Sequence, residues 1–348
     1  MAENTTLENE TPVVDYSIKL NASVALKLSN LGEINPTAIT TGPIYGFYGV
    51  ESNIINITHT IAFPTFNNFS NSNGFEDFFN LKNANSKFQE NYLEKLRATN
   101  NTANLLGWFV SSSGGKFMSQ SIIESLYQLQ ENFKNNKSDI PSILIVYDPL
   151  KSIEGYLNLK CYKLSKSFLK TITSENKFIA KNLIENKLSY KNILEEVPVV
   201  IKSNNLINLK IQEFNNITTS EDDNINQLSI NSKTFENIKY SYDQLSDSIN
   251  HLNHNLGNLN YFQRNLSRDI AKINKWENKV KQTNEELLKS NPNAKLENTD
   301  WRSEFKLLAP SSKFEYLIAT SDVNNICNNL QSIENIELVK ATGIKESI

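Results

Sequence analysis

The 348-residue chain carries 35 Lys and Arg residues against 38 Asp and Glu residues, giving a formal net charge of −3 and a pI near 5.8. This balance argues against a broad nucleic-acid interface, which needs clustered basic residues to displace counterions. Cys161 and Cys327 lie far apart, so neither a disulfide framework nor a thiolate zinc cluster is expected. No run of about eighteen apolar residues predicts a membrane span, and the polar first residues resemble no targeting peptide. These observations predict a soluble protein in the cytoplasm.

The N-terminal part of the chain alternates between strand and helix patterns. Its expected strands, with alternating or continuous apolar residues, are residues 16–20, 38–50, 54–63, 103–109, 143–146 and 156–162. Its expected helices are residues 21–32, residues 76–99 and a stretch through Ile122, Ile123, Leu126 and Leu129. Gly32 is expected to end the first of these helices. Strands interleaved with helices predict an α/β domain over residues 16–165, after a disordered tail over residues 1–15.

Beyond residue 165 the pattern becomes mostly helical. The expected segments are connecting helices and a strand over 166–217, an acidic linker over 218–228, a long helix over 229–288, a tether over 289–312, and a C-terminal helix and tail over 313–348. The strand is expected at Val197–Ile201. The last helix is expected to have an apolar face formed by Leu317, Val323, Ile326, Cys327 and Leu330.

The long helix has the clearest periodicity in the sequence. One row of apolar residues recurs every seven positions, and these are Leu245, Leu252, Leu259, Leu266, Ile273 and Val280. A second row, interrupted by Gln263 and Glu277, contains Ile249, Leu256 and Ile270. Such a seam requires a partner helix, because an apolar stripe of this length is unstable in water. The pattern leaves open whether the partner belongs to this chain or to another.

Few residues in the sequence suggest chemistry. His251 and His254 could share a metal on the long helix, but no third ligand accompanies them. The small residues from Ser112 to Gly115 would suit a phosphate cradle, yet the Gly-Lys-Ser/Thr ending of a P-loop is missing. No catalytic constellation is found, and no cofactor is expected.

Three stretches of the N-terminal part are informative in combination. They are the Gly-Trp-aromatic run within Leu105–Phe109, the Tyr-Asp-Pro turn ending Ile145–Pro149, and the strand Gly155–Tyr162. Together with the order of elements, they resemble the MPN-domain family. This resemblance implies a mixed sheet with flanking helices, followed here by a long helical C-terminal extension.

Active members of the MPN family are zinc isopeptidases, in which two His and one Asp hold the metal and a Glu acts on the bound water. Ile39 occupies the position of the Glu, and Val110 and Ser112 occupy the positions of the two His. Either Ile122 or Ile123 falls at the Asp position. Because Val and Ile offer no metal ligand, the resemblance implies the fold without metal or hydrolytic activity.

A second resemblance extends over most of the chain, from about Ile18 to Leu338. Ile193–Ser203 is similar to a segment of the h-subunit family of eukaryotic translation initiation factor three, and so is the ending around Phe305, Leu317 and Cys327. This resemblance implies a non-catalytic structural subunit that supports assembly of the 43S/48S pre-initiation complex. It also implies pairing with the MPN domain of the f subunit, a helical bundle with other subunits, and contact with the small (40S) ribosomal subunit through the complex.

Three other functions compete with this interpretation. A non-catalytic MPN subunit of the proteasome lid or the signalosome would share the domain. An isopeptidase with a displaced set of metal ligands is a second alternative. Direct contact with RNA is a third, which the acidic balance disfavours.

Two surfaces are expected to bind partners. The first is the long seam, formed by Leu245, Ile249, Leu252, Leu256, Leu259, Leu266, Ile270, Ile273 and Val280. The second is the first helix, where Val24, Leu28 and Leu31 form an apolar stripe. These three residues either contact a paired MPN domain or pack on their own sheet, and the sequence does not separate the two alternatives.

Overall fold

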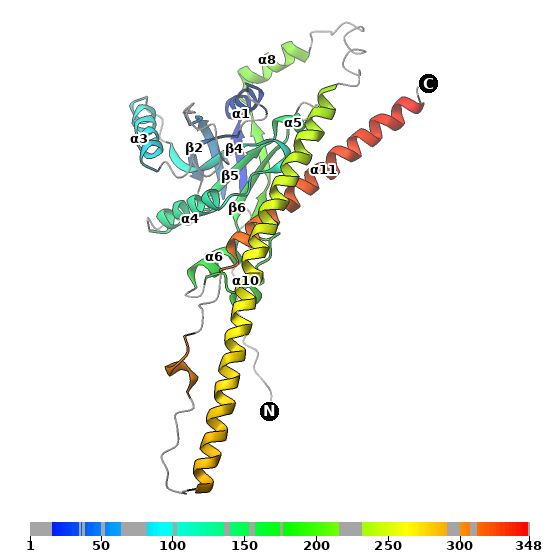
Figure 1. The fold of residues 1–348 in the computed structure, drawn as a ribbon. Helices are drawn as coiled ribbons and strands as arrows, with labels where there is room; N and C mark the ends of the chain where they lie inside the picture. Colours follow the sequence, from blue (N-terminus) through cyan, green and yellow to red (C-terminus); the bar gives the residue numbers. More distant parts are fainter. Residues whose placement is uncertain are drawn as a thin grey trace, which may run out of the picture.

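The computed structural model describes residues 16–34, 36, 39–49, 53–63, 82–99, 103–135, 140–152, 157–174, 177–215, 232–290, 300–306 and 312–346. It consists of an α/β domain and two long C-terminal helices, one of which extends far beyond the domain (Figure 1). The predicted α/β class and the predicted helical C-terminal region are therefore confirmed.

A single mixed sheet forms the centre of the domain. Its strands are β1 (Ser17–Asn21), β2 (Thr40–Gly49), β3 (Ile54–Thr60), β4 (Asn104–Ser111), β5 (Ile143–Tyr147), β6 (Leu159–Leu164), β7 (Leu194–Val197) and β8 (Val199–Lys202). They lie in the order β7-β6-β5-β4-β2-β3-β1-β8. β2 and β3 form the predicted antiparallel hairpin, while β4 and β5 are parallel. All five residues of β5 are buried, as its continuous apolar sequence predicts for a central strand.

The two ends of the sheet are joined by one short stretch of chain. β7 pairs with β6 at one end, and β8 pairs with β1 at the other. Only Pro198 separates the two strands, and its carbonyl accepts a hydrogen bond from the Ile18 amide at 3.0 Å. Proline suits this position because it donates no hydrogen bond to either ladder. The sheet therefore curls until its two edges meet at Pro198.

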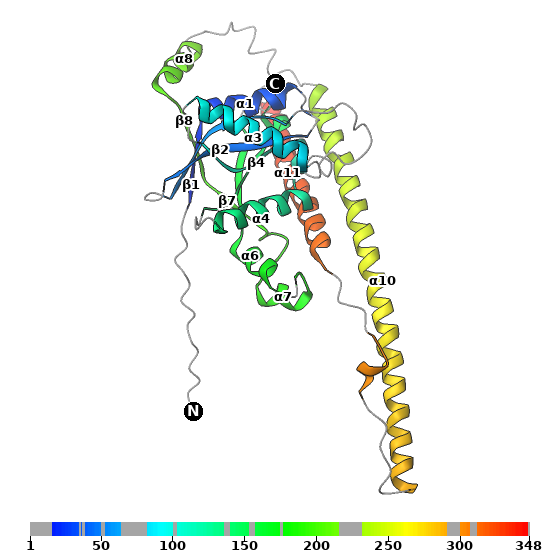
Figure 2. The same cartoon turned by 90° about the vertical axis from the view of Figure 1, so that its left-hand side faces the viewer.

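Helices cover both faces of the curled sheet (Figure 2). The helices of the domain are α1 (Ala22–Ile34), α3 (Lys82–Ala98), α4 (Gln120–Asn135), α5 (Pro149–Ser152), α6 (Lys166–Thr173) and α7 (Ala180–Glu185). A further helix, α8 (Asn205–Asn215), lies away from the sheet (Figure 2). α1 packs into a core with Ile18, Ile57 and Phe109. A second core joins Val110, Ile122 and Ile123 to residues of α6, α7 and the C-terminal helix.

The C-terminal region contains two long helices, α10 (Ser232–Ser290) and α11 (Phe314–Glu346), and a short turn, η2 (Trp301–Ser303). α10 has 59 residues and is therefore about 88 Å long. α11 begins on the domain, where Phe314 stacks on Phe178 with 4.4 Å between ring centroids. Phe314 also contacts Phe168 of α6. The start of α11 thus belongs to the core of the α/β domain.

Several predicted boundaries differ from the structure. Gly32 lies inside α1 instead of ending it. A Cβ at this position would be 2.5 Å from the Tyr147 ring, so the glycine allows the helix and this ring to pack closely. The sheet needs β7 and β8, so the domain extends well past the boundary expected at residue 165. β6 begins only at Leu159. Cys327 is exposed and lies off the buried face of α11. The tail over 1–15 and the linker over 218–228 lie outside the described residues.

Candidate functional site

Ile39, Val110 and Ser112, which the sequence resemblance aligns with the MPN metal site, lie at the adjoining ends of β2 and β4. The antiparallel register pairs Thr40 with Ser111, which places Ile39 and Ser112 next to each other just beyond the strands. Val110 is fully buried in the core, and the Ser112 hydroxyl donates a hydrogen bond to the Lys116 carbonyl. In the part of the chain that the structure describes, no group of three or more His, Cys, Asp or Glu residues is placed to hold a metal.

The turn after β4, η1 (Ser113–Gly115), contacts both C-terminal helices. Gly114 and Gly115 have φ values of 76° and 83°, a conformation that favours glycine. A Cβ on Gly114 would lie 2.2 Å from Gln244 Oε1 of α10, and a Cβ on Gly115 would lie 3.2 Å from the Asn325 carbonyl of α11. The small residues that resemble a weak phosphate cradle thus allow two helices to approach the loop.

A buried carboxylate connects these helices to the loop. Asp322 of α11 accepts a hydrogen bond from the Ser248 hydroxyl of α10 at 3.0 Å. Burial raises the pKa of the Asp322 carboxyl to about 6, whereas the Ser248 hydroxyl, the Lys116 ammonium and the Met118 amide partly oppose the rise. Lys116 and Met118 follow η1 directly, so the carboxyl lies where three segments meet.

A second polar contact joins α11 to the end of β5. Asp148 accepts hydrogen bonds from the Leu150 amide at 3.1 Å and from the Asn329 side chain at 3.2 Å. Burial raises the pKa of the Asp148 carboxyl, and the contacts with Lys151, Asn329 and Leu150 oppose the rise. The Lys151 ammonium donates a hydrogen bond to the Ser332 hydroxyl at 2.5 Å. A cavity of ≈ 390 Å³ beside this contact is lined mainly by polar residues of β6, α5 and α11.

The apolar seam of α10 is divided between buried and exposed residues. Ile273 and Val280, in the half that extends beyond the domain, are buried, where α10 meets η2 and Trp276 packs edge-on against Phe305. Where α10 crosses the domain, the buried residues are polar instead, and these are Ser241, Gln244, Ser248 and Asn255. The leucines at 245, 252, 259 and 266 are half-buried beside them.

The second row of the seam faces solvent. Ile249 is 39% exposed, Leu256 is 36% exposed and Ile270 is 44% exposed. Single exposed apolar residues are ordinary on a protein surface, but these belong to a regular row that flanks half-buried leucines. α11 therefore covers only part of the seam that the sequence predicts.

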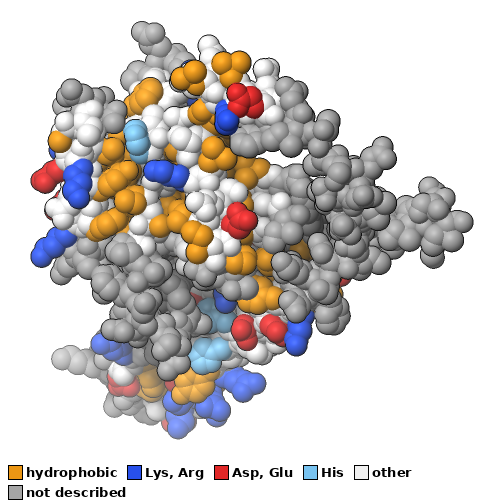
Figure 3. Space-filling view, turned by 90° about the horizontal axis from the view of Figure 1, so that it is seen from above, with side chains coloured by type: hydrophobic (Ala, Val, Ile, Leu, Met, Phe, Trp, Pro, Cys, Tyr) orange, Lys and Arg blue, Asp and Glu red, His pale blue; other side chains and the backbone are white. Residues whose placement is uncertain are grey.

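The apolar stripe of α1 lies against the sheet. Val24 and Leu28 are fully buried in the core beside β1 and β3, and Leu31 is partly buried against the same cluster. Of the two alternatives for these residues, packing on their own sheet matches the observed burial. The exposed apolar residues of α1 are Leu26 and Ile34, each 65% exposed. On the surface seen from above, hydrophobic side chains lie among charged ones (Figure 3).

Comparison with known proteins assigns the chain to a family. The model of a family described as the C-terminal region of eIF3h matches residues 152–347, from α5 to α11. The chain belongs to the eIF3h family. Three relatives are named as the H subunit of eukaryotic translation initiation factor 3. The protein from Emericella nidulans is 27% identical and aligns over 95% of both chains. That from Yarrowia lipolytica is 28% identical over 90% of this chain and 93% of the relative, and that from Dictyostelium discoideum is 27% identical over 74% and 75%.

One solved structure that matches the chain has little similarity to it. A protein from Desulfitobacterium hafniense aligns with 54% of this chain and 94% of its own length at 10% identity. Its TM-score of 0.32 is too low to support a fold assignment. The family assignment therefore rests on sequence. None of the described helices has the length and apolar character that crossing a membrane requires.

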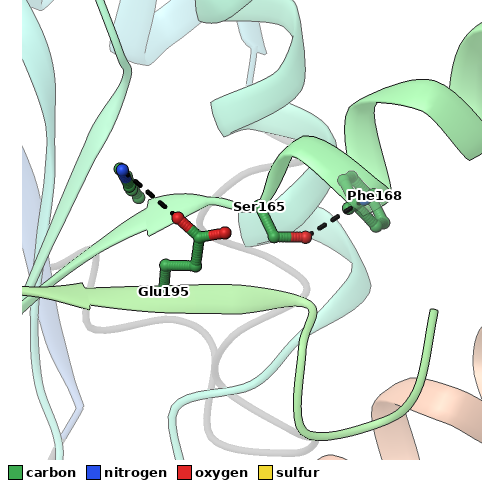
Figure 4. Close-up of polar contacts among 4 residues, drawn as sticks. Ser165, Phe168 and Glu195 are labelled. Carbon is green, nitrogen blue, oxygen red and sulfur yellow. Dashed lines mark hydrogen bonds and ion pairs between the residues drawn. The ribbon is translucent and has the colours of Figure 1, made fainter. Parts of the chain in front are cut away.

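The eIF3h match includes the segment that joins the two ends of the sheet. Glu195 of β7 forms an ion pair with Lys163 of β6 at 3.2 Å (Figure 4). Nearby, Ser165 caps α6 by accepting a hydrogen bond from the Phe168 amide at 3.1 Å (Figure 4). Its own amide donates to the Ile193 carbonyl at 3.1 Å. The Glu-Glu-Val-Pro sequence thus lies where β6, α6 and the two sheet edges are held together.

Sequence reasoning missed the polar contact between the C-terminal helices and the η1 loop. The signal available was the row Ser241, Gln244, Ser248 and Asn255, which follows one face of α10 immediately beside the leucines. Small polar residues are compatible with both solvent and a tight helix contact, so this row does not predict burial by itself. Asp322 gives no signal either, because acidic residues are usually exposed.

Proposed function

We propose that this chain is a non-catalytic structural subunit of the eukaryotic translation initiation factor 3 complex that supports assembly of the 43S/48S pre-initiation complex in the cytoplasm. The family match and the names of the curated relatives support the initiation factor. They do not support the alternative that this chain is a subunit of the proteasome lid or the signalosome. A structural subunit acts by binding its partners, so the proposed function depends on the apolar surfaces that remain exposed.

The observation that carries this proposal is the exposed row Ile249, Leu256 and Ile270 on α10. A partner helix laid along it would cover these residues together with the half-buried leucines, and would complete the seam. Each fully covered Leu or Ile side chain contributes about 1.5–3 kcal/mol relative to water. The seam therefore favours a helical bundle with other subunits of the factor.

The α/β domain supplies the second proposed contact. An MPN-type domain would pair with the MPN domain of the f subunit, and the exposed Leu26 and Ile34 of α1 are the apolar residues available for it. We assign Val24 and Leu28 to the core instead, because they are fully buried. Contact with the 40S subunit would follow from membership of the complex.

Affinity purification of two matched variants tests this proposal. Ile249→Asp with Leu256→Asp places two charges in the exposed row, and the co-purifying initiation-factor subunits should fall at least tenfold. The control, Asn250→Asp with Asn253→Asp, adds the same charges to the same turns of α10 on exposed polar positions. It should co-purify normally.

The identity of the captured chains decides among the alternatives. Recovery of lid or signalosome subunits with the wild-type chain would contradict the proposal, as would normal capture by the Ile249 and Leu256 variant. The displaced-metal isopeptidase makes a different prediction, namely stoichiometric zinc by elemental analysis together with cleavage of ubiquitin chains. Either set of results is measurable on the same purified material.

A further inference from the structure

The half of α10 that extends beyond the domain has a basic face. Between residues 261 and 281 the sequence contains six Lys or Arg residues and two acidic ones, although the whole chain is net acidic. Five of the six basic residues follow helical spacing, and these are Arg264, Arg268, Lys272, Lys275 and Lys279. At 3.6 residues per turn they lie within an arc of about 80° and span about 22 Å along the axis.

This basic face is exposed in the part of the chain that the structure describes. All five side chains are exposed. Of the five, Lys272 forms an ion pair with Asp269 at 3.2 Å, while the other four form none with any residue that the structure describes. Tyr261, one turn before the first arginine, is 70% exposed. On the helical wheel it falls within the same face, so an aromatic ring accompanies the row of charges.

Most of the opposite face of the same stretch is covered, although Ile270 remains 44% exposed. Ile273 and Val280 are buried, and Trp276 contacts Phe305 of the returning chain. A helix that lies in a membrane surface needs a broad free apolar face next to its basic one, so a lipid surface is disfavoured. Protein interfaces are depleted in lysine and depend on apolar anchors, whereas three of these five residues are lysines and the aromatic residue on their face is Tyr261.

We propose that this face of α10 (Arg264, Arg268, Lys272, Lys275 and Lys279, with Tyr261) binds the phosphate backbone of RNA. Evenly spaced Lys and Arg side chains bind phosphates and release counterions without reading sequence. An exposed Tyr can stack on an unpaired base beside a helix. The choice of RNA over DNA rests on the proposed function, whereas the choice of a polyanion rests on the charges alone. The proposal departs from the expectation based on net charge, because net charge averages over a local basic face.

Binding of a fluorescein-labelled RNA duplex of about 20 base pairs to the 348-residue chain tests this site. The variant Arg264→Gln, Arg268→Gln, Lys275→Gln and Lys279→Gln keeps good helix formers on an exposed face. We expect at least tenfold weaker binding at about 100 mM salt. We also expect the slope of log K against log salt to fall by about 3, since each lost phosphate contact contributes about 0.7–0.9.

Two controls separate this site from general charge effects. Lys27→Gln, Lys166→Gln, Lys170→Gln and Lys202→Gln removes the same total charge from exposed positions elsewhere and should bind like the wild-type chain. Arg264→Lys with Arg268→Lys keeps the charge and should retain binding. Circular dichroism establishes that each variant keeps its helix content.

Three outcomes would overturn the proposal. They are absence of RNA binding by the wild-type chain at low salt, equal weakening by the two fourfold glutamine variants, and preference for poly-glutamate over RNA. Loss of RNA binding leaves the predicted co-purification with initiation-factor subunits unchanged, because the exposed apolar row is intact. Failure of this proposal and failure of the proposed function are therefore distinguishable.

Discussion

Gly114 and Gly115 show how single residues set the position of the C-terminal helices. Both have positive φ, and both lie where an added Cβ would crowd α10 or α11. The loop after β4 is thereby a contact between elements. Next to this loop, Val110 is buried in the apolar core and Ile39 packs against the same core.

Gly114→Ala should destabilise the chain by about 1–3 kcal/mol. The left-handed backbone conformation costs roughly 1–2 kcal/mol for alanine, and the new methyl group would displace the Gln244 side chain. Gly257→Ala is the matched control, since Gly257 lies within α10 and its added Cβ would meet nothing within 4 Å. That change should stabilise the chain by about 0.5–1 kcal/mol. Urea unfolding measures both, and stabilisation by Gly114→Ala would contradict the role assigned to the loop.

At the scale of elements, α10 presents different chemistry on different faces. Its polar row contacts the η1 loop and α11, its apolar row remains partly exposed, and its distal half carries the basic face. Polar contacts hold a helix less firmly than an apolar core does, because each hydrogen bond contributes only about 0.5–1.5 kcal/mol net. The buried carboxyl of Asp322 makes this contact sensitive to pH.

The Asp322 carboxyl has a pKa of about 6 in the folded chain, above its ordinary value of 3.8. At a pH between these two pKa values, the native chain binds more protons than the unfolded chain. The stability that protonated Asp322 confers is therefore lost as the pH rises from about 4 to about 6. Asp322→Asn removes the buried charge and keeps an acceptor for Ser248. The variant should therefore be more stable than the wild-type chain by about 1–2 kcal/mol at pH 8, with a smaller advantage at pH 5.

Urea unfolding of both proteins between pH 5 and pH 8 measures this difference. Other carboxyl groups titrate in both chains and cancel in the comparison. A difference in unfolding free energy that does not change with pH would show that Asp322 keeps one protonation state throughout. A less stable variant at pH 8 would show that the ionised carboxylate contributes net stability through Ser248 and Lys116.

At the scale of the whole molecule, the domain is completed by segments from far along the chain. β8 covers β1, and β7 covers β6, although both come more than twenty residues after β6. Phe314 and Ile318 of α11 then fill the core that contains Val110 and Phe168. The α/β domain is therefore not contained within residues 16–165.

A chain ending at residue 165 should fail to unfold cooperatively. It leaves β1 and β6 with unpaired edges and opens the core that Phe168, Ile193 and Phe314 fill. A chain ending at residue 335 is the control, because it keeps every α11 side chain described as buried. Thermal unfolding and binding of a hydrophobic dye compare the two. Cooperative unfolding of the shorter chain would show that residues 16–165 suffice for the domain.

Local pattern predicted most of the elements correctly. The β2–β3 hairpin, the buried strand β5, the long helix α10 and the start of α11 all lie within a few residues of their predicted bounds. Each has a strong local signal, either a continuous apolar run or a regular helical period. The predicted end of α1 at Gly32 was wrong, because close approach to Tyr147 decides that glycine's role.

By itself the sequence determined the order of most elements and the presence of an apolar seam on α10. The replacement of metal-site residues at Ile39, Val110 and Ser112 stays a prediction from the resemblance. The tertiary structure alone decided which face of α10 is covered. Ser241, Gln244 and Ser248 are buried because the η1 glycines and Asp322 lie opposite them, and these come from segments more than seventy residues away. Periodicity shows that a helix has an apolar side, whereas contacts between distant segments determine which side remains free for a partner.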